Sequence, residues 1–246
     1  LYDRPHSLVR QSWAPVDMRS GGTVNVDGFG VGWYPHLGGE PVRYRRAGPI
    51  WADENLPGLA RTSTATAVLA AIRSGTVGMP VTDTACAPFA DGRWLFSHNG
   101  VVRDWPAAVS DIAKTLPVTD LLTLDAPTDS ALLWALVRNR LRQGQDPTSA
   151  VGAVVADVAA AAPGSRLNLL LTDGDVLIGT AWTHALSLLV TDTAVVLASE
   201  PYDSDERWQE IPDGHLVVAT RGEGTTSSTV DVRAMGQSPL GRTGRT

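Results

Sequence analysis

Short apolar runs separated by turn residues dominate the second half of the chain. Residues 167–172 and 175–180 are rich in Leu, Ile and Val, and Asp173-Gly174 stands between them. Asp-Gly between two such runs predicts an antiparallel hairpin, because these residues accept the positive φ of a tight primed turn. Further strands are expected at 185–190, 194–197, 215–219 and 229–233. Antiparallel sheet should therefore make up most of this half.

Helical spacing is found in fewer segments. Leucines between 132 and 141 recur at the spacing of one helical face, behind the N-cap candidates Thr128 and Ser130. Further helices are expected at 147–161, which is rich in Ala and Val, and at 63–72 and 105–116. Helices that alternate with hairpins are typical of layers covering antiparallel sheets, and they argue against a doubly wound parallel sheet.

Composition limits the number of domains and the classes of partner. With 246 residues, 43% of them hydrophobic, the chain fits one globular domain, placed at 1–220. Residues 221–246 are rich in Gly, Ser, Thr and Arg, so a polar tail is expected there, with its last ten or so residues disordered. The net charge of -6 argues against nucleic acid or a membrane surface as a partner.

Cysteine usage and apolar run lengths bear on the compartment. Cys86 is the single cysteine, so an internal disulfide is excluded. No apolar run approaches the ~20 residues of a membrane span. Together these features predict a cytoplasmic protein. Cys86 has no nearby base in the sequence and is interpreted as a small buried residue.

A Ser-His-Asn-Gly run at 97–100 is the first candidate for chemistry. It follows the apolar strand expected at 94–96. An ordinary loop is one interpretation. The other is an oxyanion hole, since the Asn99 carboxamide and the Gly100 N–H would offer two hydrogen-bond donors at one point. Glycine suits the second position because it has no Cβ to block a reacting carbonyl and accepts positive φ.

A second candidate would bind the two charged groups of an amino acid. Arg73 precedes the short polar loop Ser74-Gly75-Thr76, which could surround a small anion, and its guanidinium matches a carboxylate in bidentate fashion. Asp129 begins the Leu-rich helix, where favouring the helix dipole is its simpler role. Taken together, Arg73 for a carboxylate and Asp129 for an ammonium would clamp the α-amino-acid end of a substrate.

Other common site types are excluded. The glycine-rich run at 25–33 is followed by a strand and a turn, whereas a dinucleotide fingerprint needs a helix there. The five histidines show no metal-ligand spacing, and a Gly-x-Ser-x-Gly elbow is absent from the sequence. We therefore expect neither a metal nor another cofactor.

Several runs together resemble a known family, the class II glutamine amidotransferases of the N-terminal-nucleophile hydrolase superfamily. The likeness is greatest to the γ-glutamyl amidohydrolases of ergothioneine biosynthesis. It is carried by Gln11-Ser12-Trp13-Ala14-Pro15, residues 25–33, Ala87-Pro88-Phe89, Ser97-His98-Asn99-Gly100, Thr128-Asp129-Ser130 and Ala198-Ser199-Glu200-Pro201. These runs extend over most of the chain.

The resemblance implies both a fold and a set of roles. The fold is α+β, a four-layer αββα sandwich of antiparallel sheets. Asn99 and the Gly100 N–H would form the oxyanion hole, and Asp129 would receive the α-ammonium group. Arg73 and Thr76 would hold the α-carboxylate. The family's nucleophile is an N-terminal cysteine, whereas this sequence begins with Leu1; we expect the first strand, with that cysteine, to lie upstream.

The activity implied is hydrolysis of a γ-glutamyl amide bond, which releases glutamate from a γ-glutamyl-hercynylcysteine sulfoxide-like small molecule. Trp13 and Trp33 are candidates for an aromatic surface that attracts its trimethylammonium group. One alternative is a glutaminase that supplies ammonia to a partner synthase. Another is a γ-glutamyl-binding module without a nucleophile. A homo-oligomer stays open under each of these hypotheses.

Overall fold

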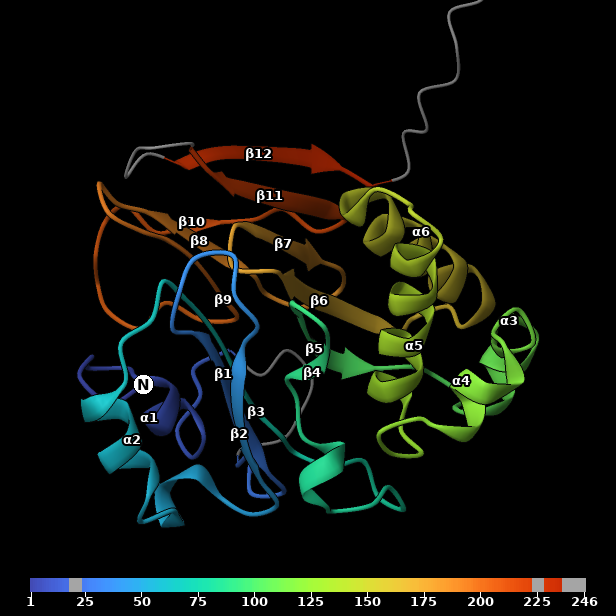
Figure 1. Cartoon of the computed structure of the whole chain (residues 1–246), viewed down its shortest axis with the longest axis horizontal. Coiled ribbons are helices and arrows are strands. Elements are labelled where there is room, and N and C mark those ends of the chain that lie inside the picture. The colour runs from blue at the N-terminus through green and yellow to red at the C-terminus, as the bar shows by residue number, and fades with distance from the viewer. Residues whose placement is uncertain (18–23, 223–227, 236–246) are drawn as a thin grey trace, which may run out of the picture.

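The computed structural model describes residues 1–17, 24–222 and 228–235 (Figure 1). Its α-helices are α1 Leu8–Gln11, α2 Leu56–Thr62, α3 Ser110–Ala113, α4 Val118–Leu122, α5 Asp129–Arg142 and α6 Pro147–Ala161, with 3-10 turns η1 Ile50–Ala52, η2 Asp83–Ala85 and η3 Ala107–Val109. Its strands are β1 Phe29–Tyr34, β2 Val42–Arg46, β3 Ala67–Ile72, β4 Phe89–Asp91, β5 Trp94–Val101, β6 Arg166–Thr172, β7 Val176–Ala181, β8 Ser187–Val190, β9 Val195–Ala198, β10 Gln209–Glu210, β11 His215–Arg221 and β12 Ser228–Ala234.

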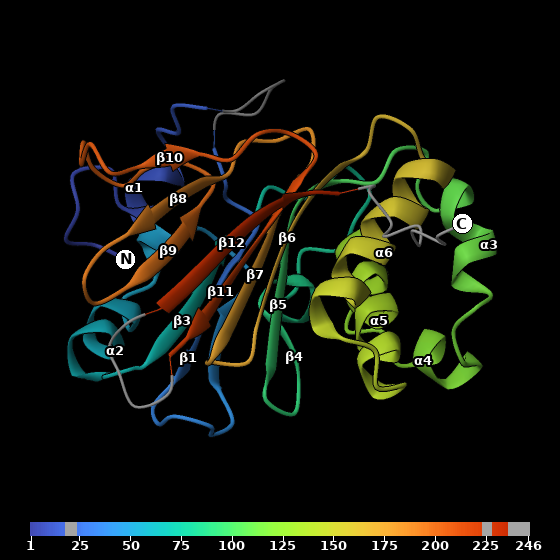
Figure 2. The same cartoon turned by 90° about the horizontal axis from the view of Figure 1, so that it is seen from above.

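The strands form antiparallel sheets. The largest has six strands in the order β12-β11-β7-β6-β5-β4, and two three-stranded sheets have the orders β2-β1-β3 and β10-β8-β9. Figure 2 shows α5 and α6 side by side on one face of the large sheet, with the two small sheets beyond its other face.

Separate apolar cores hold these layers together. Phe96 and Leu169 of the large sheet pack with Trp134 of α5 in the largest core. A second core lies between the sheet of β1 and the helices around α1 and α2, and it includes Phe29 and Leu56. Two more fill the space between the sheets, around Tyr34, Leu69 and Leu95 and around Ala181, Leu188 and Val217. The order is α, β, β, α, which confirms the predicted sandwich.

Tyr34 links two of the sheets through its buried hydroxyl. The Oη atom lies 2.7 Å from the Arg93 carbonyl oxygen and 2.9 Å from that of Thr172, to which it can donate. Burial raises the pKa of this phenol. Because the hydroxyl stays protonated, it remains a donor between β1 and the β6–β7 turn.

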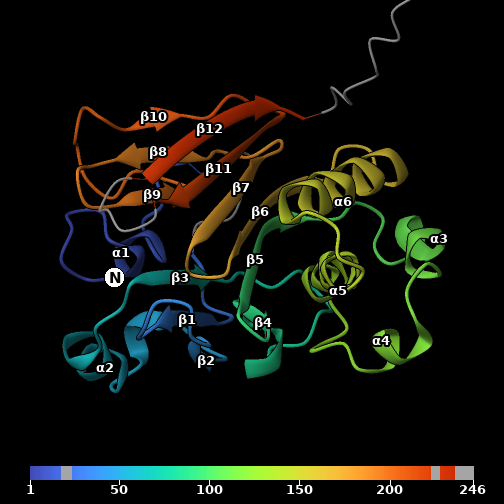
Figure 3. The same ribbon diagram turned by 45° about the horizontal axis from the view of Figure 1, so that its top comes forward.

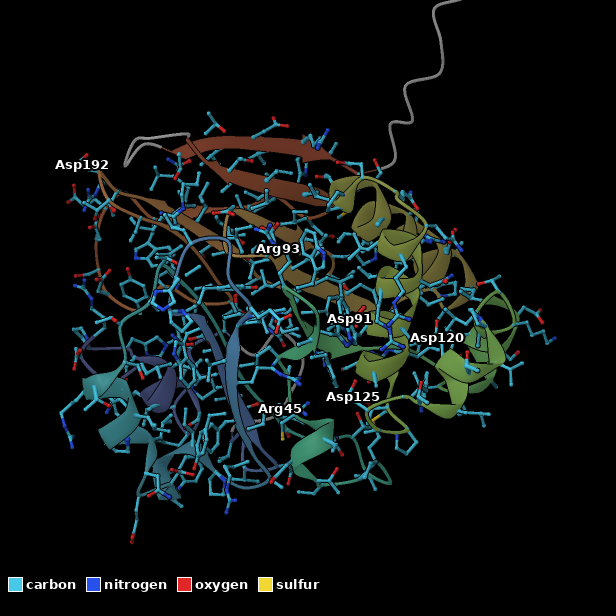
Figure 4. All side chains as sticks on the ribbon, in the orientation of Figure 1. Arg45, Asp91, Arg93, Asp120, Asp125 and Asp192 are labelled. Carbon is cyan, nitrogen blue, oxygen red and sulfur yellow. The ribbon has the colours of Figure 1, made fainter. Side chains whose placement is uncertain are left out.

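Ion pairs connect the helices α4 and α5 to each other and to the strands beside them. Arg142 at the end of α5 pairs with Asp91 of β4 at 3.1 Å and with Asp120 of α4 at 3.1 Å. Arg45 of β2 lies 3.6 Å from Asp125 in the loop before α5, so one of the small sheets also contacts this side (Figure 4).

The predicted hairpin is confirmed, but its turn lies one residue later than expected. The Asp173 N–H donates to the Val176 carbonyl at 3.4 Å, so Gly174-Asp175 are the central residues. Gly174 has φ +94°, whereas Asp173 does not adopt positive φ. The Asp173 carboxylate instead accepts from the N–H groups of Asp175 and Val176.

Two predicted helices are wrong or incomplete. Residues 67–72 of the segment 63–72 form β3, because they pair with β1 in register from Phe29↔Ile72 to Tyr34↔Ala67. Pairing and burial outweigh the helical propensity of its alanines. The segment 105–116 has helical turns only in η3 and α3.

The helix at 147–161 and the strands near 185–190, 194–197, 215–219 and 229–233 are confirmed. The disorder expected at the end of the chain falls largely on 236–246, outside the described residues.

Candidate active site

All five predicted site residues line one cavity of about 380 Å³. They come from separate elements: Asn99 and Gly100 from β5, Arg73 and Thr76 from the segment after β3, and Asp129 from the first turn of α5. The αββα packing therefore brings the predicted anion site, ammonium site and amide donors to the same space.

The Ser-His-Asn-Gly run lies within β5, not after it as the sequence suggested. Asn99 is exposed, and its Nδ2 donates to Ser199 Oγ at 2.7 Å. Gly100 has φ +156°. A Cβ at this position would overlap the Arg166 carbonyl oxygen and lie 2.8 Å from His98 Nε2. Glycine is therefore required here by the close approach of β6.

His98 connects this part of β5 to two neighbouring elements. Its Nε2 lies 2.9 Å from the Arg166 carbonyl oxygen, and its Nδ1 lies 2.9 Å from Ser130 Oγ. A carbonyl oxygen only accepts, so Nε2 carries a proton, and in the neutral ring Nδ1 accepts from the serine hydroxyl. The imidazole thus joins β5 to β6 and to the first turn of α5. The sequence alone predicts no role for this side chain.

Arg73 is held by its surroundings before any ligand binds. Its backbone N–H donates to the Gly28 carbonyl at 2.8 Å. One guanidinium nitrogen, Nη1, donates to the Pro80 carbonyl at 2.9 Å. The loop that follows is shaped by Asp27, whose Oδ2 accepts from the Gly75 N–H at 2.8 Å. Asp27 was part of the glycine-rich run singled out in the sequence, but its contact with this loop was not predicted.

Asp129 lies at the N-terminus of α5 and also lines the cavity. The carboxylate is buried, and it accepts from the Val102 N–H at 3.0 Å and from the Ser130 N–H at 2.7 Å, so it lies at the positive end of α5. Thr128 is the N-cap and accepts from the Ala131 N–H. Since Asp129 also lines the cavity, it places a negative charge where an ammonium group could bind.

Glu200 also lines the cavity, although the sequence alone predicts no role for it. Its buried carboxylate accepts from the N–H groups of Val16 and Asp17 at 2.9 and 3.1 Å, and it lies 2.6 Å from His6 Nε2. The only signal in the sequence was its place in the Ala-Ser-Glu-Pro run. The residue ties the segment around α1 to the end of β9.

Cys86 is buried and does not line the cavity, although its neighbours Ala85 and Ala87 do. Its Sγ lies 3.4 Å from the carbonyl oxygens of Arg46 and Thr82, and burial raises the pKa of the thiol. These surroundings fit the buried structural residue expected from the sequence. Within 1–17, 24–222 and 228–235, no three His, Cys, Asp or Glu side chains gather as a group that could hold a metal ion.

The tryptophans proposed for a cation surface lie elsewhere. Trp33 packs against the core that contains Phe29, and Trp13 makes an edge-to-face contact with Trp51 at 5.6 Å between ring centroids. Neither Trp13 nor Trp33 lines the cavity. In the described part of the chain, every helix is too short or too polar to cross a membrane.

Comparison with known proteins places these features in context. Residues 7–191 match the family model of the class-II glutamine amidotransferases. A protein of Mycolicibacterium smegmatis named gamma-glutamyl-hercynylcysteine sulfoxide hydrolase is 41% identical over 217 residues, which cover 88% of this chain and 87% of that protein. A protein of the same name from Mycobacterium tuberculosis is 40% identical over 236 residues, covering 96% of this chain and 92% of the relative.

Solved structures share the fold. A glutamine aminotransferase class-II domain protein from Silicibacter pomeroyi superposes with a TM-score of 0.63 at 25% identity, over 85% of this chain and 91% of that one. Glutamine phosphoribosylpyrophosphate amidotransferase from Bacillus subtilis has a TM-score of 0.62 at 12% identity. That match covers 87% of this chain and 44% of the enzyme, and it concerns the fold alone.

Proposed function

The chain belongs to the class-II glutamine amidotransferase family, and on that premise we propose that it hydrolyses the γ-glutamyl amide bond of a γ-glutamyl-hercynylcysteine sulfoxide. The products are glutamate and the free amine. The observation that carries this proposal is the single cavity shared by Arg73, Asp129 and Asn99. The two mycobacterial relatives, which are named for this substrate and about 40% identical over most of their length, support it.

The proposed binding mode uses two charged side chains that line the cavity. Arg73 and Thr76 receive the α-carboxylate of the glutamyl group, and Asp129 receives its α-ammonium. Because one guanidinium nitrogen already donates to the Pro80 carbonyl, the guanidinium is oriented before the ligand arrives. Binding both groups selects a γ-linked glutamyl residue, since an α-linked one has no free α-carboxylate.

The proposed chemistry places the scissile carbonyl oxygen between Asn99 Nδ2 and the Gly100 N–H. A thiolate adds to the carbonyl carbon, the oxyanion forms between these donors, and the amine leaves with a proton. Water then hydrolyses the thioester and releases glutamate. Each donor of this kind is worth ~10²–10³ in turnover.

The nucleophile is proposed to be a cysteine thiol that precedes Leu1 in the mature protein, with its own α-amino group as the base. The buried site of Cys86, outside the cavity, makes that residue unsuitable. The strands β3 and β9 end their three-stranded sheets in the described structure, so each offers an edge with which a further strand could pair.

The test is glutamate release by the mature full-length protein. It is incubated with γ-glutamyl-hercynylcysteine sulfoxide, with γ-glutamylcysteine and with glutamine, and glutamate and ammonia are measured. We expect the largest kcat/KM with the sulfoxide, and full activity in the matched control Cys86→Ser. Preference for glutamine with ammonia release would favour a glutaminase. Binding of the sulfoxide without glutamate release would favour a γ-glutamyl-binding module.

A further inference from the structure

Ser199 connects the end of one small sheet to the amide donor on the large sheet. The residue follows β9, whereas Asn99 belongs to β5, and the two are linked by the 2.7 Å hydrogen bond from Asn99 Nδ2 to Ser199 Oγ. Both residues line the cavity. The bond therefore joins two layers of the sandwich at the point where the proposed oxyanion would form.

We infer that Ser199 is a positioning residue that aims the Asn99 carboxamide at the substrate carbonyl. This inference rests on the proposed function of Asn99. The terminal torsion of an asparagine is soft, so an exposed carboxamide rotates readily unless a partner holds it. Its nitrogen carries two hydrogens. When one is donated to Ser199 Oγ, the direction of the other is set, and the donor is preorganised before charge develops.

Ser199 is itself held in place by its neighbour. Glu200 is buried and accepts from the N–H groups of Val16 and Asp17, and it lies 2.6 Å from His6 Nε2. Figure 3 shows α1, which follows His6, close to the sheet that carries β9. On the other side, Ala198 pairs with Ser187 of β8. Because the residues on both sides of Ser199 are held in place, its hydroxyl can orient a soft amide, whereas a hydroxyl on a loose loop could not.

The test compares Ser199→Thr with Ser199→Val, two side chains of nearly equal shape that differ by the hydroxyl. Ser199→Ala is the smaller companion. Glutamate release by the mature protein should fall about tenfold in kcat for the Val and Ala variants, with KM changed less than twofold, and Thr should retain most of the turnover. The split between kcat and KM distinguishes orientation of the donor from substrate binding.

The decisive measurement is the same substitution in an Asn99→Ala background. If Ser199 acts through Asn99, the tenfold effect of Ser199→Ala should disappear there. An effect that persists would overturn the inference, as would parental turnover in both Ser199→Val and Ser199→Ala. If Asn99→Ala alone keeps parental turnover, the proposed oxyanion hole fails and the inference fails with it. A large loss in Asn99→Ala with none in Ser199→Val rejects only the role of Ser199.

Discussion

Gly100→Ala is expected to damage the candidate site through its backbone. The new Cβ would overlap the Arg166 carbonyl oxygen and come within 2.6 Å of its carbonyl carbon, so one of the two strands must move. Overpacking of this kind costs ~1–3 kcal/mol. A non-glycine residue held in this positive-φ conformation costs a further ~1–3 kcal/mol. The matched control is Gly48→Ala, because Gly48 has φ +139°, close to that of Gly100, but a Cβ there would meet nothing within 4 Å.

The difference between the two variants isolates the close approach of β5 and β6. Gly100→Ala should lose ~1–3 kcal/mol more than Gly48→Ala. At ~2–4 °C per kcal/mol for a chain of this size, the excess loss in Tm is ~2–12 °C. Thermal unfolding followed by circular dichroism, with urea unfolding beside it, measures the difference. Equal losses in the two variants would refute the reasoning, since both would then report the cost of φ alone.

Three further substitutions test other parts of the structure. Arg73→Lys should raise KM for the γ-glutamyl substrate by roughly tenfold with a smaller effect on kcat, because a lysine lacks the bidentate fork; unchanged steady-state kinetics would remove the carboxylate role. Tyr34→Phe should lower the free energy of unfolding in urea by ~1–2 kcal/mol, because the one hydroxyl hydrogen shared by the Arg93 and Thr172 carbonyl oxygens is lost; a neutral result would show that the link between the sheets contributes little. Glu200→Gln should speed hydrogen exchange at the Val16 and Asp17 amides, and protection equal to the parent would contradict its anchoring role.

Local sequence signals predicted much of the fold. The hairpin of β6 and β7 and the helices α5 and α6 carry their own turn residues, caps and apolar faces within a few positions. β3 was misassigned because its alanines favour a helix, and its pairing with β1, about 38 residues away on average, is invisible to a local pattern.

The candidate site likewise contains residues that the local sequence indicates and contacts that depend on the packing of distant segments. Arg73, Asn99 and Asp129 could be singled out because each stands at a recognisable local position, before a short polar loop, beside a glycine or in the first turn of a helix. The contacts of Ser199 and Glu200 could not. They join residues 100 and 184 positions apart, so only the packing of the layers brings them together.

A crystal structure of the mature protein with glutamate bound measures most directly how the cavity holds its ligand. We predict the α-carboxylate within ~3 Å of the Arg73 guanidinium and the α-ammonium at the same distance from Asp129. One γ-carboxyl oxygen should accept from both Asn99 Nδ2 and the Gly100 N–H. Glutamate bound in the reverse orientation, or outside this cavity, would contradict the proposed clamp.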